Sequence, residues 1–127
     1  MSYFKDLSPY RYRDGVDRAV NVGWLSLKNP FFPRGKTCSN AVEELKNLAL
    51  SPSWRTRGYF MCPFCISERS EPALVNFKAT EIVLGSAELI VTSPDGSKFI
   101  APDLVIHYIE RHSYRPPQVF LEALKSN

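Results

Sequence analysis

Two pairs of residues in this chain have the types and spacing of metal ligands. Cys62 and Cys65 are separated by two residues, and the only two histidines, His107 and His112, are separated by four. Zinc is borderline soft and binds thiolate and imidazole groups in a tetrahedron. The two pairs therefore predict a structural Cys2His2 zinc site, closed to solvent, that joins the middle of the chain to its C-terminal region.

The spacing limits how such a site can form. The gap from Cys65 to His107 is far longer than in a zinc finger, so a DNA-reading finger is excluded. Two side chains five positions apart on an α-helix point roughly 140° away from each other. We expect the helix to loosen before His112. Otherwise only one histidine binds, and Cys38 or water completes the site. The alternative without metal has reduced, buried cysteines and ordinary packed or surface histidines.

The same cysteine pair has a second chemical interpretation. Cys62-Pro63-Phe64-Cys65 resembles the active-site motif of glutaredoxin-type thiol oxidoreductases, in which the first cysteine is a nucleophile with a depressed pKa. Such motifs open a long helix, whereas residues 66–72 predict a short helix at best. Cys38 precedes a predicted helix without a neighbouring base, and we expect it to be a buried or half-buried free thiol.

Composition restricts the class of protein. With 127 residues and 44% hydrophobic content, the chain suits one globular domain spanning residues 1–127. No apolar run reaches the ~20 residues of a membrane span, and no signal peptide is visible. An odd number of cysteines disfavours a disulfide framework, so we expect a cytoplasmic protein. The net charge of +3 is spread among acids, which disfavours nucleic acid as the partner.

Periodicity and turn residues predict an α+β domain. Strands are expected at residues 19–25, 58–61, 81–84, 87–92 and 98–101, with a Pro-Asp-Gly hairpin turn before the last. A helix capped by Ser39 is expected to run to residue 50, a second to begin with Pro102 at its first position, and a third to span residues 118–125. Together they predict a small antiparallel sheet with two or three helices to one side.

Several motifs distributed over nearly the whole chain carry a resemblance to a known family. They are Tyr3-Phe4 with residues 6–10, residues 21–25, Arg57-Gly58 with the two cysteines, residues 85–88, Ala101-Pro102, and the stretch from His107 to Pro117. In this combination the chain resembles an uncharacterised family of small bacterial proteins. The resemblance implies no activity. It also implies a histidine two places before the first cysteine, where this chain has Phe60, so the ligand set is expected to differ there.

The function expected from the residues is protein binding without catalysis. No nucleophile elbow or phosphate-binding glycine loop is visible. Aromatic residues and arginines, which dominate interface hot spots, stand out in irregular segments. Tyr12, Phe32 and Trp54 are the candidate partner-binding residues, against the alternative that these rings roof a small core. An immunity protein that neutralises a toxin would fit this size and type, and nucleic acid is the alternative partner.

Overall fold

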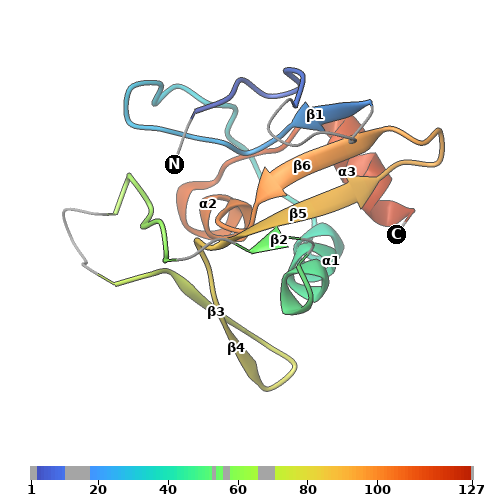
Figure 1. The fold of residues 1–127 in the computed structure, drawn as a ribbon. Coiled ribbons are helices and arrows are strands. Elements are labelled where there is room, and N and C mark those ends of the chain that lie inside the picture. The colour runs from blue at the N-terminus through green and yellow to red at the C-terminus, as the bar shows by residue number, and fades with distance from the viewer. Residues whose placement is uncertain (1–2, 11–17, 53, 56–57, 66–70, 127) are drawn as a thin grey trace.

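The structure is a computed structural model that describes residues 3–10, 18–52, 54–55, 58–65 and 71–126 (Figure 1). Six strands and three helices lie within these ranges. In chain order they are β1 (Ala19–Asn21), α1 (Ser39–Leu50), β2 (Trp54–Arg55), β3 (Leu74–Phe77), β4 (Thr80–Val83), β5 (Ala87–Thr92), β6 (Lys98–Pro102), α2 (Val105–His112) and α3 (Gln118–Lys125). The predicted single α+β domain is confirmed.

The main sheet has the strand order β1-β6-β5-β2. β5 and β6 form an antiparallel hairpin, whose predicted Pro-Asp-Gly turn is closed by the amide of Ser93 on the carbonyl of Ser97 at 2.8 Å. β2 is also antiparallel to β5, but β1 runs parallel to β6. The predicted antiparallel sheet is therefore correct for its centre, and the parallel pair at one edge is a correction. A parallel neighbour requires a long crossover, and here most of the chain lies between the two strands.

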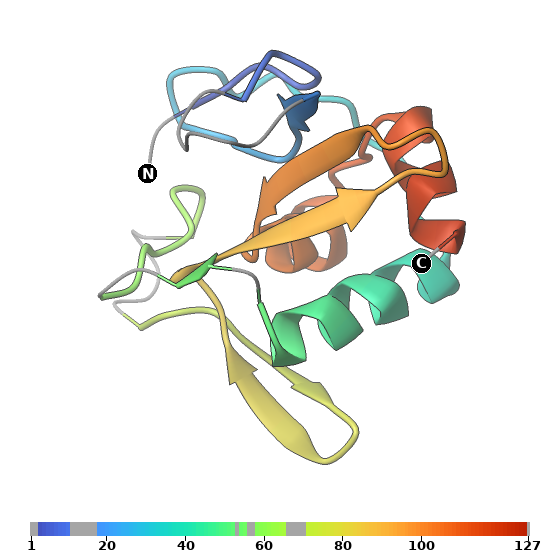
Figure 2. The ribbon, with the colours of Figure 1, turned by 45° about the vertical axis from the view of Figure 1, so that its right-hand side comes forward.

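The hairpin divides the interior into two layers. On one face Leu89 pairs with Ala101 and Val91 pairs with Phe99, and these side chains pack against the three helices. Figure 2 shows the helices gathered behind and below this hairpin. On the other face Ile100 contacts a second cluster that contains Tyr10 and Trp24. The alternation of β5 was predicted from its sequence, because successive strand residues point to opposite faces.

Several predicted boundaries are wrong, each for a local reason. The strand expected over 19–25 ends at Asn21, and Gly23 follows with φ +80°. A Cβ at Gly23 would lie 2.7 Å from Val105 Cγ2, so the close backbone approach that glycine indicated is present. Residues 58–61 form no strand. Pro102 ends β6 instead of beginning α2, whose N-cap is Leu104. α1 and α3 have the predicted bounds, although Cys38 takes the N-cap position of α1.

Two strands, β2 and β3, were not predicted from the sequence. β2 has only two residues, and β3 pairs with β4 in a separate two-stranded sheet that projects from the body of the domain (Figures 1 and 2). None of the helices in the described part of the chain has the length and apolarity that crossing a bilayer would require.

Candidate metal centre

The two cysteines lie in a tight turn, and the chain just before the turn is bonded to the loop between β4 and β5. The amide of Cys65 donates to the carbonyl of Cys62 at 3.1 Å, which closes the turn. Two residues before Cys62, the amide of Phe60 donates to the carbonyl of Gly85 at 2.8 Å. The Cys62 side chain is 3% exposed, and Cys65 is half-buried. The turn therefore presents both sulfurs toward the interior.

Asp103 links the sheet end of this arrangement to α2. One of its carboxylate oxygens accepts a hydrogen bond from the amide of Gly85 at 2.8 Å, and its own amide donates to the carbonyl of Ala87 at 2.9 Å. Burial raises the pKa of Asp103 to about 6, although hydrogen bonds from the amides of Gly85, Ala87 and Ser86 oppose the shift. The residues just before α2 are thus bonded to the same loop that binds Phe60.

Both histidines lie on α2, which continues to His112. The helix ends only after this residue, where Ser113 has φ +56°, so the expected loosening before His112 is limited to the last turn. The amides of Ser113 and Tyr114 both donate to the carbonyl of Tyr108. A bond from Ser113 to a carbonyl five residues earlier closes a wider turn than an α-helical bond does. Although the two histidines are five positions apart, Nε2 of each lies within 3.5 Å of Sγ of Cys65.

The four predicted ligands converge on one point. Their ligand atoms all lie within 4.8 Å of one another. Sγ of Cys65 lies 3.5 Å from Nε2 of His107 and 3.3 Å from Nε2 of His112, and Sγ of Cys62 lies 3.3 Å from the same atom of His112. In a zinc tetrahedron with ordinary bond lengths, sulfur and nitrogen ligands are about 3.5 Å apart. The donor set and its dimensions fit a tetrahedral metal ion.

An aromatic side chain from the turn covers one side of the cluster. The Phe64 ring lies 5.3 Å from the His112 ring and 6.0 Å from the Tyr108 ring, measured between centroids. Phe32, from the chain between β1 and α1, packs on Phe64 at 5.5 Å. An apolar shell of this kind limits water around a metal site and lowers its local dielectric constant.

The thiols differ in their environments. Burial raises the pKa of Cys62 to about 11, and the neighbouring Cys65 thiol adds to the effect. A metal ion must therefore displace a proton from this sulfur in order to bind. Cys38 lies outside the cluster at the N-terminus of α1 and is exposed, which corrects the expectation of a buried or half-buried thiol.

The candidate partner-binding residues lie elsewhere. Tyr12 is outside the described residues. Phe32 is half-buried, packs on Phe64 and Tyr114, and carries the Arg34 guanidinium 4.3 Å above its ring. Trp54 is half-buried and stacks on Tyr10 with centroids 6.5 Å apart. Both rings pack within the domain, and their role toward a partner stays a prediction.

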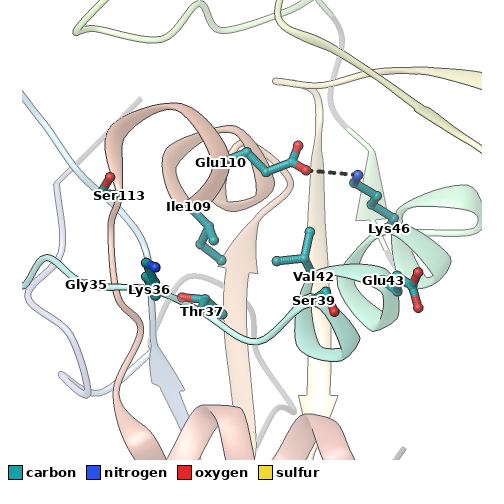
Figure 3. A pocket seen from close by; sticks show the side chains of 10 residues that line it. All are labelled: Gly35, Lys36, Thr37, Ser39, Val42, Glu43, Lys46, Ile109, Glu110 and Ser113. Carbon is teal, nitrogen blue, oxygen red and sulfur yellow. Dashed lines mark ion pairs between the residues drawn. The ribbon is translucent and has the colours of Figure 1, made fainter.

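A cleft between α1 and α2 was not predicted from the sequence (Figure 3). Val42 and Ile109 form its apolar part, and Lys46 reaches across from α1 to Glu110 with a nitrogen–oxygen distance of 3.0 Å. None of the four clustered cysteines and histidines lines this cleft. Its residues come from separate elements with no motif in common, so their spacing in the sequence carried no signal.

The fold and the site define a small α+β domain with a candidate Cys2His2 metal centre between a turn and a helix. One family model matches nearly the whole chain. The chain belongs to the family described as Domain of unknown function (DUF7919), whose model matches residues 2–125. The resemblance to an uncharacterised family is thereby confirmed. No curated protein and no solved structure matches the chain.

Proposed function

We propose that Cys62, Cys65, His107 and His112 bind one zinc ion, and that this ion has a structural role. The convergence of two sulfurs and two imidazole nitrogens within 4.8 Å carries the proposal. The ligands come from two distant segments of the chain: Cys65 and His107 are 42 positions apart. An ion between them crosslinks the turn to α2, and such a bond contributes on the order of 10 kcal/mol to the folding of a small site.

The ligand number favours structure over catalysis. With four protein ligands, a tetrahedral zinc ion has no open position for substrate or for an activated water molecule. A thiol nucleophile, in turn, needs access to solvent and a depressed pKa. Cys62 is 3% exposed, which leaves it without the solvent access that the oxidoreductase alternative requires.

Metal content tests the zinc site. Protein purified without a His tag should contain about one equivalent of zinc, as expected for a single tetrahedral site. The Cys65→Ser and His112→Ala variants should lose the metal, and a chelator should lower the Tm of the wild type. Cys38→Ser is the matched control, because Cys38 lies outside the cluster. Less than about a tenth of an equivalent, with no effect of the chelator, would contradict the proposal.

The oxidoreductase alternative predicts different results. Under mild oxidation the thiol count should then fall by two as Cys62 and Cys65 form a disulfide, and the protein should reduce a disulfide substrate. Both results together would replace the zinc proposal.

For the whole domain we propose a metal-stabilised, cytoplasmic module that binds another protein. Its support is the exposure of large apolar side chains, including Tyr59 and Phe31. An immunity protein that masks a toxin is the setting that best suits this size. A partner protein should remain bound through moderate salt, whereas binding to nucleic acid should weaken steeply with salt. Retention on nucleic acid without any partner protein would contradict the module.

A further inference from the structure

The connection between β1 and α1 has an unusual surface. Residues 22–38, called the 22–38 loop below, contain Lys28, Arg34 and Lys36 but no acidic residue. Phe31 is 99% exposed and Leu27 is 57% exposed. A fully solvated phenylalanine forgoes roughly 1.5–3 kcal/mol of burial free energy. The loop thus offers two exposed apolar side chains and contributes only positive charges of its own, although Lys36 also lines the cleft that contains Glu43 and Glu110.

The loop is held in place by backbone bonds at two points. Its tip turns where the amide of Asn29 donates to the carbonyl of Ser26 at 3.2 Å. Its second half lies antiparallel to the chain after α2: the amide of Gly35 donates to Ser113 and the amide of Arg115 donates to Pro33, each at 2.9 Å. A loop that is ordered before binding loses less conformational entropy when a partner docks.

The same half of the loop contacts the metal centre. Phe32 packs on Phe64, and the Arg34 guanidinium donates to the carbonyl of His112 at 3.0 Å. Phe32 therefore faces inward while the adjacent Phe31 faces solvent. This division assigns the two phenylalanines different roles: Phe32 anchors the loop, and Phe31 is available to a partner.

We infer that the tip of the 22–38 loop is the docking surface for an acidic segment of a partner protein. The inference rests on the proposed binding function and names the surface that performs it. Phe31 and Leu27 enter an apolar site on the partner, and Lys28, which lies between them in the sequence, faces its carboxylates. Aromatic anchors of this kind carry most of the binding free energy of an interface, while surrounding charges set specificity and association rate.

Two features favour a protein over single-stranded nucleic acid. Nucleic-acid surfaces bind successive bases by stacking them on aromatic rings. Leu27 has no ring, and at the tip Phe31 is the one large exposed aromatic side chain among described residues 22–38. An exposed apolar pair with a lysine between its members suits a peptide in which hydrophobic side chains alternate with carboxylates.

A library of random dodecapeptides displayed on phage tests the inference. It is selected on metal-loaded wild-type protein and counter-selected on the Phe31→Ala variant. The enriched peptides should combine Asp or Glu with large apolar residues. A synthetic peptide with the enriched sequence should bind Phe31→Ala about tenfold or more weakly than wild type, as expected for a hot spot. Lys28→Glu should also weaken binding, and the effect should shrink in high salt.

Val119→Ala is the matched control, since Val119 is an apolar residue of α3 that is 49% exposed. It should bind the peptide like wild type, and all variants should keep wild-type metal content and Tm. Peptides that bind Phe31→Ala and Val119→Ala equally well would show that the tip of the 22–38 loop is not the docking surface. The proposed binding function would still stand. If no peptide were enriched and no partner protein were found, both the docking surface and the proposed binding function would be contradicted. Binding of a labelled oligothymidylate that depends on Phe31 would overturn the protein partner.

Discussion

A Cβ atom at Gly85 would lie 2.2 Å from the carbonyl oxygen of Phe60. Gly85 has φ +111°, and its carbonyl accepts the amide of Phe60. The glycine thus allows the chain before Cys62 to lie directly on the loop before β5. Through Asp103 the same loop is bonded to the start of α2, which carries the histidines. One backbone contact therefore sets how far the cysteine turn lies from its imidazole partners.

Gly85→Ala should destabilise the domain and weaken its metal binding. The side chain would both strain the backbone and push Phe60 away, at a combined cost of about 3 kcal/mol or more. The free energy of unfolding in urea and the zinc content are the measurements. Gly58→Ala is the control, because Gly58 also has positive φ but a Cβ there would meet nothing within 4 Å. It should cost only about 1 kcal/mol. Equal losses for the two variants would show that the contact with Phe60 is unimportant.

Metal removal should change the number of reactive thiols. In the metal-loaded protein only Cys38 should react quickly with an aromatic disulfide reagent, because it is exposed and lies outside the cluster. After chelation all three cysteines should react, as the turn loses its link to α2. Cys38→Ser should show no fast thiol before chelation. If Cys62 and Cys65 reacted at the rate of Cys38 in untreated protein, the metal centre would be refuted.

Asp103 should make stability depend on pH between about 4 and 6. Its pKa rises from 3.8 to about 6 in the folded protein because the carboxyl group is buried. In this interval the folded state binds a proton that the unfolded state does not, so the contribution of Asp103 to stability falls as pH rises and levels off above about 6. The total change is on the order of 3 kcal/mol.

The measurement is the difference in free energy of unfolding between the wild type and Asp103→Asn, taken at several pH values. Asparagine keeps an oxygen acceptor for the amide of Gly85 but does not titrate in this range. Loss of metal at low pH affects both proteins and cancels in the difference. A difference that stayed constant from pH 4 to pH 6 would show that the carboxyl group of Asp103 is not perturbed.

The hairpin turn between β3 and β4 should be improvable by substitution. Phe77 pairs with Thr80, so Lys78 and Ala79 form a two-residue loop, and their φ angles are +50° and +62°. This turn favours Asn-Gly, because other residues pay roughly 1 kcal/mol for positive φ. Ala79→Gly, alone or with Lys78→Asn, should therefore raise the free energy of unfolding. Asn47→Gly at an exposed position of α1 should lower it by a few tenths of a kcal/mol, the difference between the helix propensities of the two residues. A loss of stability in Ala79→Gly would contradict the turn assignment.

Residue chemistry and local periodicity could be read directly from the sequence. Cys62, Cys65, His107 and His112 were predicted as candidate ligands because few side chains bind zinc, so their types and spacing are informative even over a long gap. The bounds of α1 and α3 and the hairpin of β5 and β6 also followed from the sequence. Each is determined by neighbours within a few positions, through apolar periodicity or turn residues.

The remaining features depend on contacts between distant segments. β1 is parallel to β6 because of how the chain crosses the sheet, and neither strand's own sequence encodes this. Phe31 and Phe32 are adjacent and identical in type, yet one is exposed and the other packs on Phe64. The exposure of Cys38 is likewise set by what lies around it. The identity and spacing of the ligands were determined by the sequence. Their convergence was decided by the tertiary structure, because only packing brings the Cys62 turn to α2.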